Sequence, residues 1–531
     1  MRNAVSIAVL AFAMAAAPQL AWAQTTEDEI VVTATRAPGG LARDQIGGSV
    51  TLFSERDLVE RQVVAVTDIL RDSPGVAVSR SGPLGGVTQV RMRGAEGNHT
   101  LVMIDGIDAS DPYSGEFDFG LLIADELARV EVLRGQQSSL YGSDAIGGVI
   151  HYLTASGADE QGARARFEVG SFSTAEMSVR AGGVNGPIDW AVSGNITDTD
   201  GSPSDPDGSR DLAYNNQVLA GRFGWTVTDD FSLTGVIRAR QSEGDFNEDL
   251  DFDSIVDDSP GTYYEDEAIY ALARAELSLG EAWTHALTVQ GVDGSRLNVT
   301  PLGFFTQTQS QAQRIKASYV ATVRFGGEGF EQQLTGAIDY REDQFETLSL
   351  PEASIAQTGY VLEYNALIGE RLGLGASLRQ DHNDRFEDST TYRVQASYAF
   401  DTGARLRGAI GSGVKNPIMN ELFGYGSGYL GNPDLQPEES VGWEIGLEQN
   451  FFDRTVLVGA TYFDNELENE IRLTGFAPAT PINLDGTSTQ TGVELFARAD
   501  LGQWSFDAAY TYLDAEESMA TGTRPEIRRA E

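Results

Sequence analysis

Residue types that usually carry catalysis are sparse in this sequence. Cysteine is absent, which excludes disulfide scaffolds, iron–sulfur clusters and thiol catalysis. No Gly-x-Ser-x-Gly segment occurs, and the four histidines are scattered without metal-ligand spacing: His99, His151, His285 and His382. Gly426–Gly431 matches the dinucleotide-binding fingerprint, but Asn432-Pro433 follows where a helix would have to start. The residues therefore argue against an enzyme.

Carboxylates are the most abundant candidate ligands. Two segments are strongly acidic, and their hard oxygen atoms suit calcium. The candidate calcium ligands are Asp200, Asp205, Asp207 and Asp211 in the first segment, and Asp249, Asp251 and Asp253 in the second. Neither segment has EF-hand spacing, so the alternative is that both are solvated loops. We expect no required cofactor, with calcium as the one candidate for these loops.

The overall charge limits the classes of molecule that the protein is expected to bind. Asp and Glu number 79 against 37 Lys and Arg, which gives a formal net charge of −42. A chain this acidic repels nucleic acid, whose binding depends on neutralising phosphates. The charge suits a surface that contacts cations, cationic substrates or divalent-bridged lipopolysaccharide. The alternative is that it only keeps long acidic loops soluble.

The first 23 residues predict export. Arg2 precedes an apolar run from Ala4 to Ala17, and Ala21-Trp22-Ala23 is a small-residue cleavage site. These features are typical of a secretory signal peptide. The run is shorter than the roughly 20 residues that a membrane-spanning helix needs.

From about residue 158 to residue 531, segments of roughly ten residues alternate in polarity. Trp504, Phe506 and Tyr510, for example, share one face of an expected strand, and polar side chains take the other. About eighteen such segments follow one another, and Trp, Tyr and Phe lie near their ends, as in an aromatic girdle. A soluble β-sandwich would show the same alternation. The length, number and aromatic ends of the segments favour an all-β, antiparallel transmembrane barrel, because lipid requires backbone polar groups to pair internally.

Residues 40–157 have a different pattern of apolar and polar residues. Ser54 begins a capping box, and apolar residues from Leu58 to Leu70 at helical spacing predict one helix that ends at Ser73-Pro74-Gly75. Short apolar strands are expected to follow, at Gln89–Met92, Thr100–Ile104, Arg129–Leu133 and Val149–Leu153. This stretch predicts a small α/β domain ahead of the barrel.

Several motifs, in order along the chain, resemble those of the TonB-dependent outer-membrane receptors. Glu29–Thr35 resembles the Ton box of that family. The other similar segments are Asp68–Val76, Val90–Gly94, Leu101–Gly106, Glu131–Gly135, Leu140–Val149, Lys415–Pro417, Asn420–Phe423 and Gly431–Glu438. Within the family, Tyr141–Val149 and the Ton box are most similar to the cobalamin (vitamin B12) receptors, and ferric-siderophore receptors share much of the pattern.

The resemblance implies a fold and a function. It implies a barrel, of 22 strands in the family, with the α/β domain inside it as a plug, and a location in the outer membrane of a Gram-negative cell. It implies active import of a scarce small ligand, cobalamin or alternatively a ferric siderophore, energised by TonB of the inner membrane. Outer-membrane lipid and lipopolysaccharide would surround the barrel. A passive porin is the alternative class, but it would need an open lumen and no plug.

The Ton box predicts how TonB binds. Its residues are Glu29, Ile30, Val31, Val32, Thr33 and Ala34. A segment rich in strand formers can add itself to the edge of a partner's sheet through backbone hydrogen bonds. The alternative is an ordinary N-terminal strand of the plug.

Two further groups of candidate residues concern the plug. Arg93 and Arg134 each precede a glycine at a strand end, and Glu444 and Glu494 have the inward phase on barrel strands. We expect these four residues to form a latch of arginine–carboxylate pairs, the alternative being two unrelated surface arginines. Ligand-binding loops are expected at the outer face of the plug, with the candidates Ser79, Arg80, Ser81, Tyr113 and Phe117.

The end of the chain departs from the family pattern. Barrels of this type end on an aromatic residue, whereas this sequence ends Arg528-Arg529-Ala530-Glu531. Residues 158–531 are also few for 22 strands with long loops. The sequence therefore predicts that about four C-terminal strands are missing.

Overall fold

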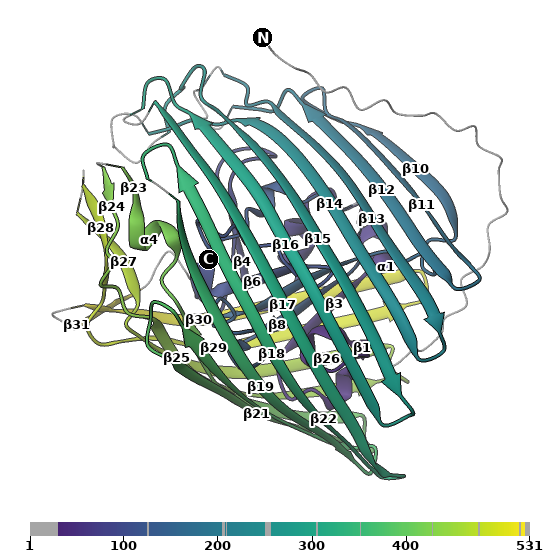
Figure 1. Ribbon diagram of the computed structural model, residues 1–531. Coiled ribbons are helices and arrows are strands. Elements are labelled where there is room, and N and C mark those ends of the chain that lie inside the picture. The colour runs from purple at the N-terminus through teal and green to yellow at the C-terminus, as the bar shows by residue number, and fades with distance from the viewer. Residues whose placement is uncertain are drawn as a thin grey trace.

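The computed structural model in Figure 1 describes residues 30–124, 127–203, 208, 210–249, 256–303, 306–350, 352–426, 428–475, 478–519 and 522–525. The predicted signal peptide (residues 1–23) and Glu29 lie outside these ranges. Within them, no helix is both long enough and apolar enough to cross a membrane.

In the described part of the chain, eighteen strands form one antiparallel sheet that curves around the N-terminal domain (Figure 1). This number agrees with the eighteen segments expected from the sequence. Strands pair in chain order, except that β22 pairs with β25 and β26 with β29. The strands are β10 (Gly162–Val169), β11 (Ala175–Asn185), β12 (Ile188–Thr199), β13 (Tyr214–Thr228), β14 (Phe231–Asp245), β15 (Tyr263–Leu279), β16 (Trp283–Val299), β17 (Gln307–Gly327), β18 (Phe330–Thr347), β19 (Ala353–Ile368), β20 (Leu372–Asn383), β21 (Ser389–Ala399), β22 (Ala404–Lys415), β25 (Glu438–Phe451), β26 (Val456–Glu468), β29 (Thr487–Leu501), β30 (Trp504–Met519) and β31 (Gly522–Pro525).

The alternation of polarity becomes two faces of the sheet. On β25, Trp443, Ile445 and Leu447 point outward and are 43%, 49% and 53% exposed, whereas Glu444 points inward and is buried. On β30, Trp504 and Phe506 are exposed in the same way. Because successive side chains of a strand point to opposite faces, strands such as β25 present an apolar outer face and a polar inner face.

The two ends of the sheet have different connections. At one end, β13 and β14 are joined through Asp229–Asp230, and β29 and β30 through Gly502–Gln503. At the other end, several connections are long, and two of these contribute a separate four-stranded sheet: β23 (Gly424–Gly426), β24 (Tyr429–Leu430), β27 (Ile471–Gly475) and β28 (Ala479–Asn483), with the helix α4 (Met419–Phe423). This asymmetry matches the short periplasmic turns and long extracellular loops of outer-membrane barrels.

The N-terminal domain is a mixed α/β unit. Its main sheet has the order β3-β8-β9-β6-β7, in which β6 and β9 run parallel. A hairpin of β4 and β5 and a short pair of β1 and β2 stand apart from it. The strands are β1 (Ile30–Val31), β2 (Leu41–Ala42), β3 (Val50–Ser54), β4 (Val76–Arg80), β5 (Thr88–Met92), β6 (Thr100–Ile104), β7 (Ile107–Asp108), β8 (Leu127–Arg134) and β9 (Gly148–Thr154).

The single helix expected between Ser54 and Leu70 is wrong. The capping box of Ser54 and Asp57 is present and begins α1 (Glu55–Glu60), but the chain then breaks, and α2 (Val66–Leu70) follows. Gln62 has a φ of 50°, which a helix does not allow. Ala65 forms a β-bridge with Ile123. Pairing with another part of the domain therefore overrides the helical spacing. The remaining helices are short: η1 (Val32–Ala34), η2 (Arg43–Gln45), η3 (Gly97–His99), η4 (Phe119–Leu121) and α3 (Ser138–Tyr141).

The core joins the two parts of the protein. Its largest cluster is built from residues of the N-terminal domain such as Ile69, Val132 and Ile150. Val236 and Tyr270 of the barrel wall belong to the same cluster. The N-terminal domain thus packs against the inner face of the barrel through apolar contacts as well as polar ones.

Candidate functional site

The N-terminal segment lies folded against the domain that follows it. Ile30 and Val31 pair with Ala42 and Leu41 as a two-residue antiparallel ladder, and Val32–Ala34 forms one turn of 3-10 helix. Val31 and Thr33 are fully buried, and Ile30 is 39% exposed. The expected extended segment is therefore extended only at its first two described residues.

Glu131 on β8 holds this segment. Its carboxylate accepts hydrogen bonds from the backbone N–H of Val32 (3.3 Å) and of Thr33 (2.9 Å), and from the Thr33 hydroxyl (2.6 Å). Three donors on one buried carboxylate stabilise the turn, because hydrogen bonds to a charged acceptor are the strong ones.

His151 on β9 completes the contact. The Gly106 N–H donates to its Nε2 (2.9 Å), so Nδ1 carries the proton and donates to the Thr33 hydroxyl (2.9 Å). Burial, together with the positive charges of Arg129 and Arg222, lowers the pKa of His151 to about 3. The imidazole is therefore neutral at any physiological pH and acts as a fixed hydrogen-bond relay.

Arg36, two residues beyond the turn, ties the segment to the barrel wall. Its guanidinium donates to Asp339 of β18 (2.6 Å), Ser318 of β17 (2.8 Å) and the carbonyl of Leu140 (2.9 Å). Its backbone N–H donates to Glu363 of β19 at 2.9 Å. Sequence reasoning missed this arginine, although its place directly after the Ton-box motif was a signal that could have found it.

The four residues of the expected latch do meet. Arg93 donates from Nε to Glu494 (2.8 Å) and from Nη2 to Glu444 (2.7 Å), and all three side chains are buried. Arg93 also lies over the ring of Phe463, 4.5 Å from its centroid. Burial alone would lower the pKa of Arg93, but the charges of Glu494 and Glu444 raise it above its usual value.

Arg134 contributes less to this wall contact. Its Nε lies 3.7 Å from Glu494, while its hydrogen bonds go to Ser73 (3.2 Å) and to the carbonyl of Pro74 (2.6 Å) within the N-terminal domain. Burial and the nearby charge of Arg93 lower its pKa to about 10. Arg134 therefore mainly holds the turn at Pro74 that presents Arg93 to the wall.

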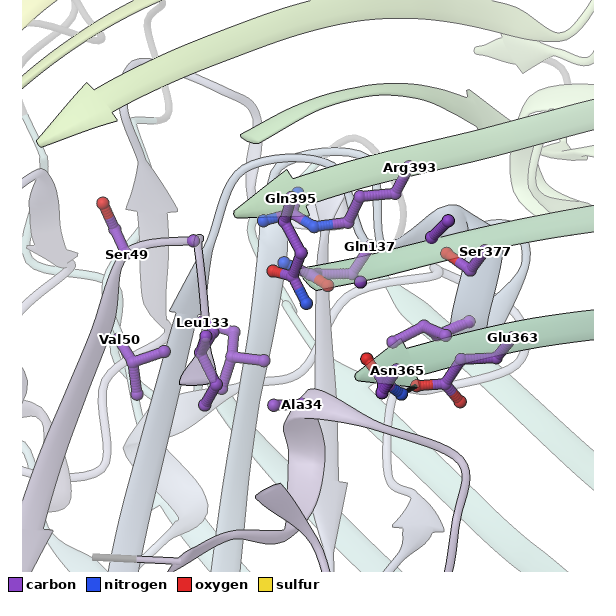
Figure 2. A pocket seen from close by; sticks show the side chains of 15 residues that line it. Ala34, Ser49, Val50, Leu133, Gln137, Glu363, Asn365, Ser377, Arg393 and Gln395 are labelled. Carbon is purple, nitrogen blue, oxygen red and sulfur yellow. Dashed lines mark hydrogen bonds between the residues drawn. The ribbon is translucent and has the colours of Figure 1, made fainter. Parts of the chain in front are cut away.

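A small gap separates the N-terminal segment from the barrel. Figure 2 shows Ala34, Val50 and Leu133 on one side of it and Glu363 and Asn365 on the barrel strands opposite. Its volume is about 20 Å³, enough for one water molecule. The seam is thus nearly closed and polar on the wall side.

The residues expected to bind the ligand differ in where the structure places them. Arg80 bonds to Thr67 (3.2 Å) at the end of the β4–β5 hairpin, and Ser79 and Ser81 beside it are exposed. Tyr113 packs on Phe345 with ring centroids 5.1 Å apart, and its hydroxyl donates to the carbonyl of Gly424 (3.1 Å). Tyr113 thus connects the N-terminal domain to the long loop that carries α4.

Phe117 is not a surface residue, contrary to expectation. It is 5% exposed and makes an edge-on contact with Phe119, with ring centroids 5.1 Å apart. Both rings belong to the largest core cluster. The sequence predicts Phe117 in a ligand-binding loop at the outer face of the plug, but burial of its ring in the core is the stronger driving force.

A second cavity, of about 50 Å³, lies towards the end with long connections. Its apolar lining includes Ile355, Phe386, Ile418 and Met419, and its polar lining includes Ser143, Asp144, Arg341, Asp343, Gln357, Lys415 and Asn416. The N-terminal domain forms its floor, and the segment that carries α4 covers it.

The charges around this cavity are balanced in pairs. Asp144 accepts from Lys415 (2.7 Å) and from Arg341 (2.7 Å), and these cations hold the pKa of Asp144 well below its usual value although burial raises it. Arg341 and Arg314 both contact Asp343, and Arg314 reaches Asp108 at 2.7 Å. The carboxylates of Asp108, Asp144 and Asp343 therefore form ion pairs with Arg314, Arg341 and Lys415.

The calcium candidates are only partly described. Asp205, Asp207, Asp251 and Asp253 lie outside the described residues. Asp200, Asp211 and Asp249 lie within them, and in that part of the chain no three acidic or histidine side chains are grouped to hold a metal ion. Calcium binding stays a prediction.

Two family models match the chain. The "TonB dependent receptor-like, beta-barrel" model matches residues 160–528, and the "TonB-dependent Receptor Plug Domain" model matches residues 42–149. The chain belongs to the TonB-dependent receptor family. The N-terminal domain is its plug, and the family acts as receptors and transporters rather than as enzymes.

Curated relatives and solved structures agree with this family. "Vitamin B12 transporter BtuB" of Vibrio vulnificus is 27% identical, over 84% of this chain and 71% of the relative. The protein of the same name from Photobacterium profundum is 26% identical, over 93% and 80%. The siderophore receptor PirA of Acinetobacter baumannii has a similar fold, with a TM-score of 0.74 at 18% identity, over 90% of this chain and 82% of that one. A variant of the ferric enterobactin receptor PfeA of Pseudomonas aeruginosa gives a TM-score of 0.72 at 18% identity, over 89% and 84%.

Proposed function

We propose that this receptor resides in the outer membrane and imports vitamin B12, with energy supplied by TonB. The curated relatives that cover most of the chain are named as vitamin B12 transporters. The observation that carries the choice of ligand is the charge balance of the cavity beneath α4, where Asp108, Asp144 and Asp343 offset Arg314, Arg341 and Lys415.

Charge balance favours a neutral ligand for a physical reason. A multiply charged anion entering this cavity would need unpaired cations, but each arginine and lysine of the network is engaged by a carboxylate. Separating such pairs without replacement costs several kcal/mol, about 3–5 for a buried pair. Cobalamin presents neutral amide arms, and the tip of one such arm is complemented by the amides of Gln357 and Asn416 and the apolar side chains of Phe386 and Met419 around this cavity of about 50 Å³.

TonB would act at the opposite end of the plug. Ile30 and Val31 pair with only two residues of β2, so this short ladder is easily replaced by the edge of a partner's sheet. Release also requires the loss of the Glu131 and Arg36 contacts. The segment is thus held weakly enough to be removed and firmly enough to stay folded at rest.

Binding to intact outer membranes tests the ligand. Cells displaying the receptor, with the chain's own signal sequence, would be incubated with radiolabelled cyanocobalamin, with and without calcium, and with ferric enterobactin as competitor. We expect saturable cobalamin binding that ferric enterobactin does not displace. Calcium-dependent binding would support the acidic-loop prediction. Binding of the ferric chelate in place of cobalamin, from an inserted barrel, would assign the receptor to iron.

A cavity variant and a matched control test whether cobalamin contacts the cavity. Asn416→Leu replaces the cavity amide with an apolar side chain of similar size and should weaken cobalamin binding about tenfold, the effect of losing one or two hydrogen bonds. Asn185→Leu, exposed at the end of β11 beside a short turn, is the control. Equal affinity of both variants and the parent would show that the cavity does not contact the ligand.

A further inference from the structure

The inner face of the barrel wall carries a row of amides beside the N-terminal segment. Asn365 on β19 stands directly opposite Gly375 on β20, and Gly375 stands opposite Gln395 on β21. Gln333 on β18 stands opposite Asn365 on its other side. We call Gln333, Asn365 and Gln395 the amide row. Asn365, Gly375 and Gln395 line the small gap beside Ala34, where Figure 2 shows the two amide side chains.

Gly375 leaves room for two of these amides to approach one another. A Cβ atom at this position would lie 2.9 Å from the Asn365 Oδ1 and 2.9 Å from the Gln395 Nε2. Any side chain here would therefore push the two amides apart. The backbone does not require glycine, because the φ of Gly375 is outside the left-handed region. The glycine thus provides space between the amides rather than conformational freedom.

The amide row has hydrogen-bonding capacity that the described protein does not use. The Gln333 Nε2 is buried and makes no hydrogen bond within the described residues. The Gln395 amide makes none within them either, although it faces the gap. Asn365, by contrast, donates to Glu363 (2.7 Å). Because buried polar groups are normally hydrogen-bonded, the row indicates a partner that is absent at rest.

The neighbouring row shows what kind of group the wall accepts here. It consists of Glu363, Ser377 and Arg393, which stand opposite one another on β19, β20 and β21. The Glu363 carboxylate accepts the backbone N–H of Arg36 (2.9 Å), and Ala34 lines the same gap. A peptide N–H of the N-terminal segment therefore occupies this face. A primary amide offers the same N–H donor to the carboxylate, and its carbonyl oxygen is an acceptor for the amide row.

The short helix α3 separates this gap from the cavity beneath α4. Leu140 of α3 lines the gap, whereas Asp144, just beyond α3, lines the cavity. The N-terminal segment holds α3 in place, because the Tyr141 hydroxyl donates to the carbonyl of Thr33 (2.9 Å) and Arg36 donates to the carbonyl of Leu140 (2.9 Å). Withdrawal of the segment therefore removes both contacts and empties the gap in the same event.

We propose that the amide row and Glu363 form a second ligand site, for a primary amide arm of the ligand, which the N-terminal segment fills at rest and vacates when TonB withdraws it. This rests on the proposed function, because cobalamin supplies the amide arms. The segment acts as an internal blocker whose peptide N–H stands in for the ligand's amide. A ligand that leaves the cavity beneath α4 thus meets a second amide-binding site only after TonB has engaged.

The first test fills the space between the amides. Gly375→Ala places a methyl group there, and Gly336→Ala on β18, where a Cβ meets nothing within 4 Å, is the matched control. Binding of radiolabelled cyanocobalamin to unenergised cells should be the same for both variants and the parent. The maximal rate of energised uptake should fall about fivefold in Gly375→Ala, the effect of losing one hydrogen bond, and stay unchanged in Gly336→Ala. Equal uptake by the two variants would overturn the proposal, as would an equal loss of binding and uptake in Gly375→Ala.

The second test concerns the amide chemistry. Gln395→Leu removes a side chain whose amide makes no hydrogen bond within the described residues, so the fold should be preserved. Its energised uptake should fall by a similar factor with surface binding unchanged. Gln395→Asn keeps an amide and should recover most of the rate. An asparagine variant as slow as the leucine variant would show that the amide is not what the ligand contacts.

The third test measures occupancy of the gap in the purified full chain. Because the chain has no cysteine, Ser377→Cys provides a single reporter in the gap lining. A maleimide should react slowly with the receptor alone, about tenfold faster once the periplasmic domain of TonB is bound, and slowly again in excess cyanocobalamin. Adding Gly375→Ala should abolish this protection.

Two results of the reporter experiment would overturn the proposal. They are an unchanged rate when TonB is bound, and a raised rate that cyanocobalamin does not lower. Absence of cyanocobalamin binding to cells that display the parent receptor would instead contradict the proposed function. The two failures are therefore distinguishable.

Discussion

At the scale of single residues, Arg36 is the side chain that connects the N-terminal segment to the barrel wall. It contacts β17, β18 and the carbonyl of Leu140, and only Thr35 separates it from the turn that Glu131 holds. Removing it leaves Asp339 paired with Arg379 at 2.7 Å, so no buried carboxylate is abandoned. Arg36→Ala therefore removes the contacts between the segment and the wall without leaving a buried carboxylate unpaired.

We expect Arg36→Ala to expose the N-terminal segment. Because the chain has no cysteine, Val31→Cys provides one buried reporter, and its rate of reaction with a maleimide measures opening. The rate should rise about tenfold, since a charge-assisted hydrogen bond contributes about 1.5–3 kcal/mol. Arg371→Ala, in an exposed turn, is the control. An unchanged rate would mean that the Glu131 contacts alone hold the segment.

Arg93 gives the second prediction at this scale. Arg93→Glu would place three carboxylates together in a buried site, and breaking a buried pair in this way costs about 3–5 kcal/mol. The plug should become sensitive to protease added from the periplasmic side while the barrel stays resistant. Arg71→Glu, exposed at the end of α2, serves for comparison. A resistant plug in the Arg93 variant would contradict the latch.

At the scale of elements, the N-terminal segment must serve as a folded turn and as a donor of backbone hydrogen bonds. Val32→Pro removes the N–H that bonds to Glu131 and that would pair with TonB. Cobalamin should still bind, but its energised uptake should fall to background. Val32→Ala keeps the N–H and should transport normally. Uptake by the proline variant would show that TonB engages another segment.

The element α4 should respond to pH. Burial, with the nearby charge of Glu438, raises the pKa of Glu421 to about 7, against the opposing effect of Lys415. A carboxyl whose folded pKa is raised contributes stability that is full below its unfolded pKa of about 4.5 and is lost as pH rises to about 7. Hydrogen exchange in α4, corrected for its intrinsic pH dependence, should therefore be slower at pH 5.5 than at pH 8. Glu421→Gln should abolish this difference, and a difference that survives would assign it to another group.

At the scale of the whole molecule, periodic features could be predicted, whereas contacts between residues far apart in the sequence could not, except for the latch of Arg93 with Glu444 and Glu494. Strand alternation gave the eighteen strands and the inward phase of Glu444 and Glu494, because phase depends only on local sequence. Arg36 with Asp339 was missed, since 303 positions separate them and only the curvature of the sheet around the plug brings them together. Phe117 and the break at Gln62 were misjudged for the same reason, as each depends on packing with a distant element.

The two attachments of the N-terminal segment have a mechanical consequence. Ile30 and Val31 are bound to the plug, whereas Arg36 is bound to the barrel. A pulling force at the N-terminus therefore loads the β1–β2 ladder first, then the Glu131 contacts, and Arg36 last. Bonds broken one after another yield at lower force than bonds loaded together. Once the ladder and the Glu131 contacts have broken, the tension passes through Arg36 to the wall rather than to the plug, so slack can be drawn from the first residues without displacing the plug from its seat.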